Sequence, residues 1–103
     1  MIVARTDVPA AYFSANAGAK GIGAAQKSYG AWLTIARASK WQQPADVTLA
    51  HPKARILKSG RVVFNIKGND YRLVTIVEYQ TGTVAIRFFG THAEYDKIDA
   101  ETV

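Results

Sequence analysis

The chain has 103 residues, no cysteine, and a net charge of +5 that arises from 13 basic and 8 acidic residues. Its length favours a single domain over residues 1–103, because a core of this size cannot usefully be divided. The absence of cysteine excludes disulfides, zinc sites built from thiolates, and thiol nucleophiles. The positive charge favours polyanionic partners, since cationic side chains release counterions when they bind a nucleic acid.

The sequence contains no feature that predicts a membrane protein. No apolar run approaches the roughly 20 residues that a bilayer-spanning helix needs. The N-terminal stretch MIVARTDVPAAYF lacks the basic-then-apolar order of an export signal. We therefore expect a soluble, cytoplasmic protein without a membrane partner.

The first part of the chain predicts two helices separated by a glycine-rich loop. The first helix is expected to begin near Pro9, with Thr6 or Asp7 as its cap. The three glycines of residues 16–23 predict a loop, because glycine stabilises regular elements poorly. Apolar residues at spacings of three and four predict the second helix over residues 24–39. The expected core contacts of the two helices are Tyr12, Phe13, Tyr29, Trp32, Leu33 and Ala36.

The segment after the second helix is expected to be irregular. Trp41 could stack on a nucleic-acid base, but its position beside a helix favours packing in the core. We expect Pro44 to stop the helix, because proline cannot continue the backbone hydrogen-bond ladder. Asp46 can cap a brief turn, which is followed by a loop through His51 and Pro52.

Beyond Arg61 the apolar pattern changes to a period of two, which is typical of strands. Residues 61–67, 71–79 and 83–89 are rich in Val, Ile, Phe and Tyr, and therefore predict three consecutive antiparallel strands. The connections at 68–70 and 80–82 contain Gly and Asn, which tolerate the positive φ angles of tight hairpin turns.

The length of the turns decides which side chains share a face of the sheet. We expect two-residue turns, because a three-residue loop would place Arg72 beside Phe64 and Ile66 on an apolar face. The expected outer face then holds Asn65, Lys67, Arg72, Val74, Ile76, Ala85 and Arg87, and the inner face holds Val62, Phe64, Ile66, Leu73, Val77, Val84, Ile86 and Phe88. An inner face that packs on the helices gives an α+β fold, with N-terminal helices on a small antiparallel sheet.

A short C-terminal helix is expected directly after the last strand. Thr91 and Glu94 match the capping box, in which the two side chains bind each other's backbone N–H groups. The helix would therefore begin at His92. Since His92 and Tyr95 are three residues apart, their side chains would lie on one helical face.

Cations beside a titratable ring suggest cleavage of RNA without a metal ion. This reaction needs a base for the 2′-hydroxyl, cations for the charged phosphorane, and an acid for the departing 5′-oxygen. The candidates are His92 as general acid or base, Arg72 and Arg87 at the scissile phosphate, Lys67 for backbone phosphate or charge stabilisation, and Tyr95 for stacking or proton relay.

Each of these assignments has a structural alternative. Arg72 and Arg87 could be solvated, or paired with Glu78 or Asp96, because surface ion pairs are common. A histidine at a helix start often serves as a cap or a packing residue. No cofactor is expected, and the only two histidines lie too far apart in the sequence to favour a metal site.

Three segments, WQQPADV, VVFNIKGNDYRLV and IRFFGTHAEYDKID, closely resemble the HigB family of type II toxins. The similarity extends from about Trp32 onward and implies a RelE-like fold. It also implies a ribosome-dependent mRNA interferase, a cognate HigA-like helix-turn-helix antitoxin, and operator DNA bound only through the complex of toxin and antitoxin. The polar signature of the family falls on Lys67, Asn69, Arg72, Arg87, His92 and Tyr95, and we expect Asn65, Asn69, Lys67 and Arg72 to bind RNA.

The N-terminal third differs from the expected pattern of the family. The Gly/Ala-rich stretch NAGAKGIGAAQ stands where the family usually has a polar, acidic segment, so recognition of the antitoxin or helix length could differ. Two other functions remain open. The chain could be a non-catalytic RNA-binding or assembly module that uses the same basic face, or a structural partner that only occupies an antitoxin groove.

Overall fold

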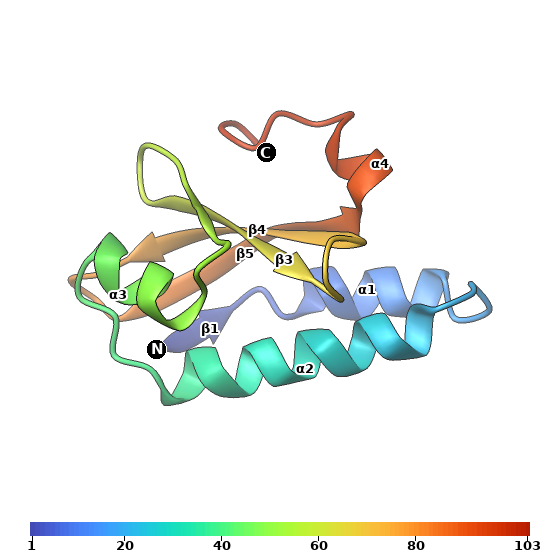
Figure 1. The fold of residues 1–103 in the computed structure, drawn as a ribbon, viewed down its shortest axis with the longest axis horizontal. Helices are drawn as coiled ribbons and strands as arrows, with labels where there is room; N and C mark the ends of the chain where they lie inside the picture. Colours follow the sequence, from blue (N-terminus) through green and yellow to red (C-terminus); the bar gives the residue numbers. More distant parts are fainter.

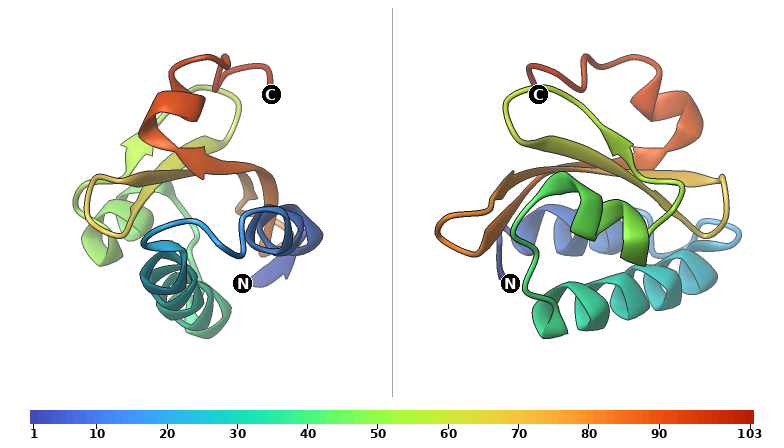
Figure 2. Two further views of the ribbon diagram at one scale, coloured as in Figure 1. Left: turned by 90° about the vertical axis from the view of Figure 1, so that its right-hand side faces the viewer. Right: turned by 60° about the vertical axis from the view of Figure 1, so that its left-hand side comes forward.

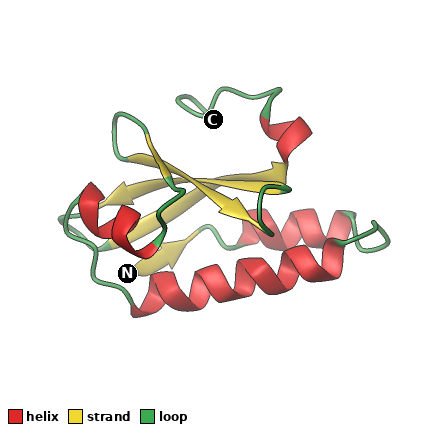
Figure 3. Cartoon of the chain, in the orientation of Figure 1, coloured by secondary structure: helices red, strands yellow, loops and turns green.

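The computed structural model describes residues 1–103, which form a twisted sheet with the two longest helices on one side and a short C-terminal helix on the other (Figure 1 and Figure 3). In chain order the elements are β1 (Ile2–Ala4), α1 (Asp7–Ala15), α2 (Ile22–Ala38), α3 (Pro44–Ala50), β2 (Arg55–Ile56), β3 (Arg61–Ile66), β4 (Tyr71–Glu78), β5 (Thr83–Thr91) and α4 (His92–Tyr95). None of the helices is long and apolar enough to cross a membrane.

The sheet has five strands in the order β1-β5-β4-β3-β2. The three strands expected from the sequence are β3, β4 and β5, and they pair antiparallel as predicted. Two short strands extend this meander at its edges: β2 pairs antiparallel with β3, and β1 pairs parallel with β5. The α+β fold is confirmed, with a mixed sheet in place of a purely antiparallel one.

The helices and the C-terminal part of the chain lie on opposite sides of the sheet. Both views in Figure 2 place α1 and α2 below the sheet, and α4 with the segment that follows it above. The core lies between the inner face and the helices, and Trp41 is buried in it as expected. Of the predicted helical contacts, Phe13, Tyr29, Trp32 and Ala36 are buried, whereas Tyr12 and Leu33 are half-buried at its margin.

The helix boundaries differ from the prediction at three places. The first helix begins at Asp7, and Thr6 is its N-cap residue without a side-chain hydrogen bond. The second helix begins at Ile22, two residues earlier than predicted. The prediction for Pro44 was wrong: α2 already ends at Ala38, and Pro44 begins α3 because the first turn of a helix needs no proline N–H. Asp46 lies in that first turn.

Both hairpin loops are longer than predicted. The last paired residues are Ile66 with Tyr71 and Glu78 with Thr83, so each connection has four residues and not two. Because side chains alternate along a strand, two extra residues do not change the face on which each side chain lies. Lys67 is an exception, since its φ of 53° takes it out of β3 and into the turn.

A β-bulge at Arg87 changes the predicted assignment near the end of β5. Val74 pairs with Phe88 and Thr75 pairs with Ile86, so Arg87 is the extra residue. The prediction that Phe88 lies on the inner face was therefore wrong. Phe89 is buried in the core, and Phe88 is half-buried opposite Val74.

The outer face is less open than the sequence predicts. Val63 and Val74 on this face are buried although they do not belong to the main core. The C-terminal segment, residues 97–103, lies on this side of the sheet (Figure 2). Arg61 holds this segment with hydrogen bonds to the main-chain oxygens of Ala100, at 3.1 Å, and Val103, at 2.6 Å. Of the predicted cationic surface, Arg87 is also bonded to this segment but stays exposed.

Candidate active site

The short helix α4 forms as predicted, through a complete capping box. The Oγ1 atom of Thr91 accepts a hydrogen bond from the backbone N–H of Glu94 at 3.1 Å. In return, Oε1 of Glu94 accepts one from the backbone N–H of Thr91 at 2.8 Å. The N–H of His92 donates to the main-chain oxygen of Asp70 at 2.9 Å, which fixes the start of α4 against the turn between β3 and β4.

Arg72 reaches the C-terminal helix from β4. Its guanidinium lies 6.0 Å from the ring centroid of Tyr95, in cation–π range. It also donates to the Oδ1 atom of Asn69 at 2.6 Å and to the main-chain oxygen of Asn69 at 2.9 Å. These bonds hold the planar guanidinium in one orientation, and Arg72 makes no ion pair with an acidic residue. The structure thus brings Arg72, Tyr95 and Asn69 together.

A second arginine, Arg55, lies at the same tyrosine and was missed in the sequence analysis. Its Nη1 atom lies 3.5 Å from the hydroxyl oxygen of Tyr95, and the side chain is exposed. Arg55 belongs to the two-residue strand β2, which is too short for a periodicity signal. The sequence does contain a hint, because a cation stands between apolar residues in the stretch ARIL just before the predicted strands.

His92 is exposed and is oriented by a carboxylate. Its Nδ1 atom lies 3.1 Å from Oδ2 of Asp96, one helical turn further on. No hydrogen bond joins the imidazole to Arg72 or Arg87. An imidazole held by a carboxylate is the usual arrangement of an acid–base catalyst whose second ring nitrogen faces the reactant.

Arg87 lies on the outer face but is not in contact with Arg72. Arg72 pairs with Gly90, three residues beyond Arg87 on β5, which corresponds to about 10 Å along the strand. The Nε atom of Arg87 donates to the main-chain oxygen of Val103 at 3.3 Å, the same oxygen that binds Arg61. The alternative pairing of either arginine with Glu78 or Asp96 is not observed.

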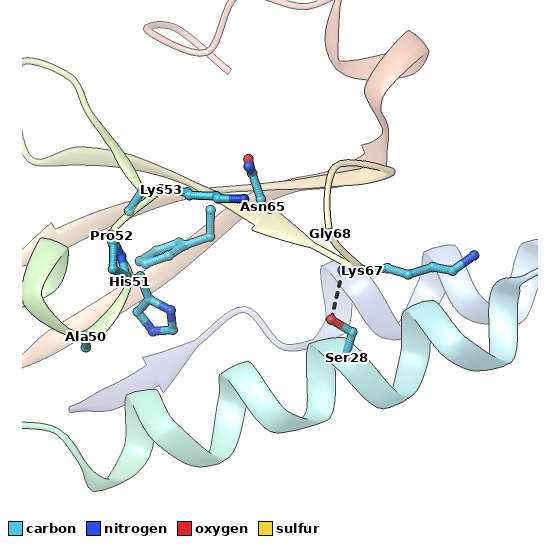
Figure 4. A pocket seen from close by; sticks show the side chains of 10 residues that line it. Ser28, Ala50, His51, Pro52, Lys53, Asn65, Lys67 and Gly68 are labelled. Carbon is cyan, nitrogen blue, oxygen red and sulfur yellow. Dashed lines mark hydrogen bonds between the residues drawn. The ribbon is translucent and has the colours of Figure 1, made fainter.

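Lys67 and Asn65 lie at a cavity of about 340 Å³ beside the end of β3, beyond the residues that pair with β2. The backbone N–H of Lys67 donates to Oγ of Ser28 at 2.8 Å, and its Nζ atom lies 3.4 Å from Oδ2 of Asp70. Figure 4 shows Lys53 extending toward Asn65, whereas Lys67 points away from the other cavity residues. Lys67 is thus a partly neutralised cation beside the candidate site.

His51 lines the same cavity and behaves as a packing residue. Its ring lies 5.1 Å from that of Phe64 and 5.9 Å from that of Trp41. Burial lowers the pKa of His51, and its Nε2 atom has no hydrogen-bond partner. No three His, Asp or Glu side chains are grouped so that they could hold a metal ion.

Tyr12 and Glu94 connect α1 to α4. The hydroxyl of Tyr12 donates to Oε1 of Glu94 at 2.6 Å. Burial, together with this carboxylate, raises the pKa of Tyr12, and the hydroxyl in turn lowers the pKa of Glu94. Both shifts favour an ionised Glu94 that accepts from a neutral Tyr12.

Comparison with known families gives a clear result. Residues 25–98 match the model of the HigB toxin family, described as the RelE-like toxic component of a toxin-antitoxin system. The chain belongs to the HigB toxin family. Among curated proteins, no sequence matches the chain. Membership in this family implies an antitoxin partner. The matched region includes every candidate site residue and leaves β1 and α1 outside.

Proposed function

We propose that this HigB-family protein is a ribosome-dependent mRNA endoribonuclease that inhibits translation. The observation that supports this function best is the convergence of Arg55 and Arg72 on Tyr95, next to the His92–Asp96 pair. Two cations beside an aromatic ring suit a phosphate with a neighbouring base, and the imidazole adds a group that can transfer a proton.

In the proposed reaction, a base removes the proton of the 2′-hydroxyl on the nucleotide before the scissile bond. The 2′-oxygen attacks phosphorus, and the bond between phosphorus and the 5′-oxygen breaks. The products are a 2′,3′-cyclic phosphate and a 5′-hydroxyl, which receives a proton from an acid. No water, metal ion or oxidant enters these bond changes.

His92 is the proposed proton-transfer residue, and Asp96 orients its ring. Arg72 is proposed to bind the scissile phosphate, because an already oriented guanidinium stabilises the phosphorane charge without reorganisation. Arg55, which reaches the hydroxyl of Tyr95, would support the same phosphate. Tyr95 is proposed to stack on a flanking base or to relay a proton.

The remaining candidates are proposed to bind the RNA backbone. Asn65, Lys67 and Asn69 lie along the edge of the site nearest the cavity at β3. The exposed Arg87 can join them with its free N–H groups, and its Nε atom can do so when a phosphate oxygen replaces the main-chain oxygen of Val103. We propose that RNA binding makes this exchange, which would require the C-terminal segment to shift.

The proposed partners follow from membership in the family. A HigA-like helix-turn-helix antitoxin would neutralise the toxin, and the pair would bind operator DNA that the toxin alone does not bind. The proposed compartment is the cytoplasm, where translating ribosomes are found.

The decisive test is cleavage of a defined mRNA on translating ribosomes, with new 5′ ends mapped by primer extension. Free mRNA and the His92→Ala variant are run in parallel. We expect cuts confined to codons in the ribosomal A site, and a loss of about 10²- to 10⁴-fold in His92→Ala if His92 transfers protons. Circular dichroism of the variant checks that it is folded.

Three other results would change the proposal. Equal cleavage of free mRNA would contradict ribosome dependence. Full activity in folded His92→Ala would remove the imidazole from the chemistry and leave the arginines as the main catalysts. RNA binding with a steep salt dependence but without new 5′ ends would favour the non-catalytic RNA-binding module.

A further inference from the structure

We propose that Tyr12 is a positioning residue whose hydroxyl holds Glu94, and with it the helix α4 that contains His92 and Tyr95, against the sheet. The catalytic consequence rests on the proposed function. The tether itself is a property of the fold and can be tested without RNA.

The geometry of the tether is specific. The hydroxyl of Tyr12 and Oε1 of Glu94 are 2.6 Å apart, although 82 positions separate the two residues in the chain. A hydrogen bond of this length to an ionised carboxylate belongs to the stronger class. The same Oε1 atom also accepts the backbone N–H of Thr91. Tyr12 thus binds the side chain that defines the first turn of α4.

The helix α4 has few other contacts, chiefly those of the Tyr95 side chain with the exposed arginine Arg55 and with Arg72. It spans four residues, none of them buried, and a helix this short is not stable by its own hydrogen bonds. Apart from the capping box, its start is held by the bond from His92 N–H to Asp70. A single additional contact can therefore decide how well His92 and Tyr95 are oriented.

The ring of Tyr12 is itself well anchored. Its centroid lies 5.2 Å from that of Phe89 and 6.3 Å from those of Phe13 and Tyr71, each in an edge-on arrangement. Because these contacts fix the ring, the direction of the hydroxyl is fixed as well. The tether therefore connects α4 to the hydrophobic core and not merely to another surface group.

Gly90 leaves the room that Glu94 needs. A Cβ atom at position 90 would lie 3.1 Å from Oε1 and 3.3 Å from Cβ of Glu94, and 2.8 Å from Cζ of Phe88. A side chain at this position would thus push against the carboxylate that Tyr12 binds. The close approach of α4 to β5 depends on this glycine.

The tether also gives a role to a part of the chain outside the family match. Tyr12 belongs to α1, whereas the matched region begins at residue 25. We infer that α1 acts as a support for the candidate site, in addition to covering the sheet.

The first experiment compares Tyr12→Phe with Tyr29→Phe. Both variants keep an aromatic ring in the same cluster, but the hydroxyl of Tyr29 is buried without a hydrogen-bond partner. In Tyr12→Phe we expect the amides of residues 96–98 to exchange about tenfold faster, because a charge-assisted bond is lost. The amides of β3 and β4 should exchange as before, and Tyr29→Phe should leave residues 96–98 unchanged. Unchanged exchange in Tyr12→Phe would overturn the tether, whether or not the wild-type chain cleaves RNA.

A second comparison tests whether the two side chains act through one bond. If they do, Glu94→Gln should accelerate exchange in α4, and adding Tyr12→Phe to it should have little further effect. Fully additive accelerations would show that Tyr12 acts on α4 by another route, and would overturn the proposal.

The catalytic consequence is read from mRNA cleavage on ribosomes. A positioning role predicts that Tyr12→Phe lowers kcat about tenfold with little change in KM, whereas Tyr29→Phe cleaves like the wild type. A loosened α4 with unchanged kcat would overturn the positioning role. A wild-type chain that cleaves nothing would instead contradict the proposed function, and the exchange measurements would still decide the tether.

Discussion

Two pairs of arginines lie on the outer side of the same sheet, and their surroundings differ. Arg55 and Arg72 converge on Tyr95 and make no ion pair, so their charges are available to an external anion. Arg61 and Arg87 both donate to the main-chain oxygen of Val103, so a part of the chain already takes the place of an anion.

The comparison shows that residue type and face do not suffice to assign a phosphate site. All four side chains are cations near one surface, but only the first pair has an aromatic neighbour and a nearby imidazole. The second pair binds the C-terminal segment through the main-chain oxygens of Ala100 and Val103. We therefore expect the first pair to serve catalysis, and the second to contribute less, through RNA binding.

The largest expected effect is on Arg72. Arg72→Ala should lower the rate of mRNA cleavage about 10²- to 10³-fold, as is typical when a group that stabilises the transition state is removed. Arg37→Ala is the matched control, because Arg37 is an exposed arginine in the last turn of α2, on the other side of the sheet. A similar loss in both variants would show that net charge matters and the site does not.

A smaller effect is expected for Arg87→Ala. Because Arg87 is bound to the chain itself, we expect a loss of cleavage of only about tenfold, and a salt dependence of RNA binding that is less steep by about 0.7 in log–log slope. Titrations of single-stranded RNA at several salt concentrations measure this slope. A loss as large as that in Arg72→Ala would contradict the distinction between the two pairs.

The features that follow local rules were predictable from the sequence. The period of two gave the three central strands, and the Thr91–Glu94 spacing gave the capping box of α4. The expected faces of β3 and β4 were right even though both loops were longer than predicted, because the change of two residues preserves the alternation. The RelE-like fold and the toxin family were likewise recognisable from the segments around α4 and the β3–β4 hairpin.

The features that depend on distant parts of the chain were not predictable. The bulge at Arg87 reversed the roles of Phe88 and Phe89, and no residue type marks it in the sequence. The position of the C-terminal segment depends on bonds from Arg61 to residues about forty positions away. Arg55 was not predicted, because its strand β2 is defined by pairing with β3 and has no apolar periodicity of its own. Long-range contacts of this kind leave no local signal.

The second pair can be tested through stability. Arg61→Ala removes the bonds to Ala100 and Val103, and we expect the free energy of unfolding to fall by about 1 kcal/mol. Limited proteolysis should cut the C-terminal segment faster, while sites in β4 stay protected. Arg55→Ala is the control, because Arg55 makes no bond to this segment. If the segment stays protected in Arg61→Ala, the arginines do not fasten it.

The smallest expected effect is a pH dependence that is confined to α4 and arises from the ionisation of Glu94. Glu94 has a lowered pKa in the folded protein, chiefly because the hydroxyl of Tyr12 donates to it, with Thr91 N–H contributing next. Its contribution is therefore fully present above its ordinary pKa, about 4.5, and is lost as the pH falls through the lower folded value. The amide NMR shifts of residues 96–98 should follow this change as the pH falls below the ordinary carboxyl value.

A titration of His51 would produce a different pattern. Burial lowers the pKa of His51, so the protein loses stability as the pH falls below the ordinary histidine value of about 6.5, and the loss affects the core around Phe64. The Tyr12→Phe variant distinguishes the titration of Glu94 from that of His51. Without the hydroxyl, the midpoint of the α4 shifts should rise toward the ordinary carboxyl value, while shifts around His51 stay where they were. If the pH midpoint of the α4 shifts is the same in Tyr12→Phe as in the wild type, the capping box alone determines the charge of Glu94.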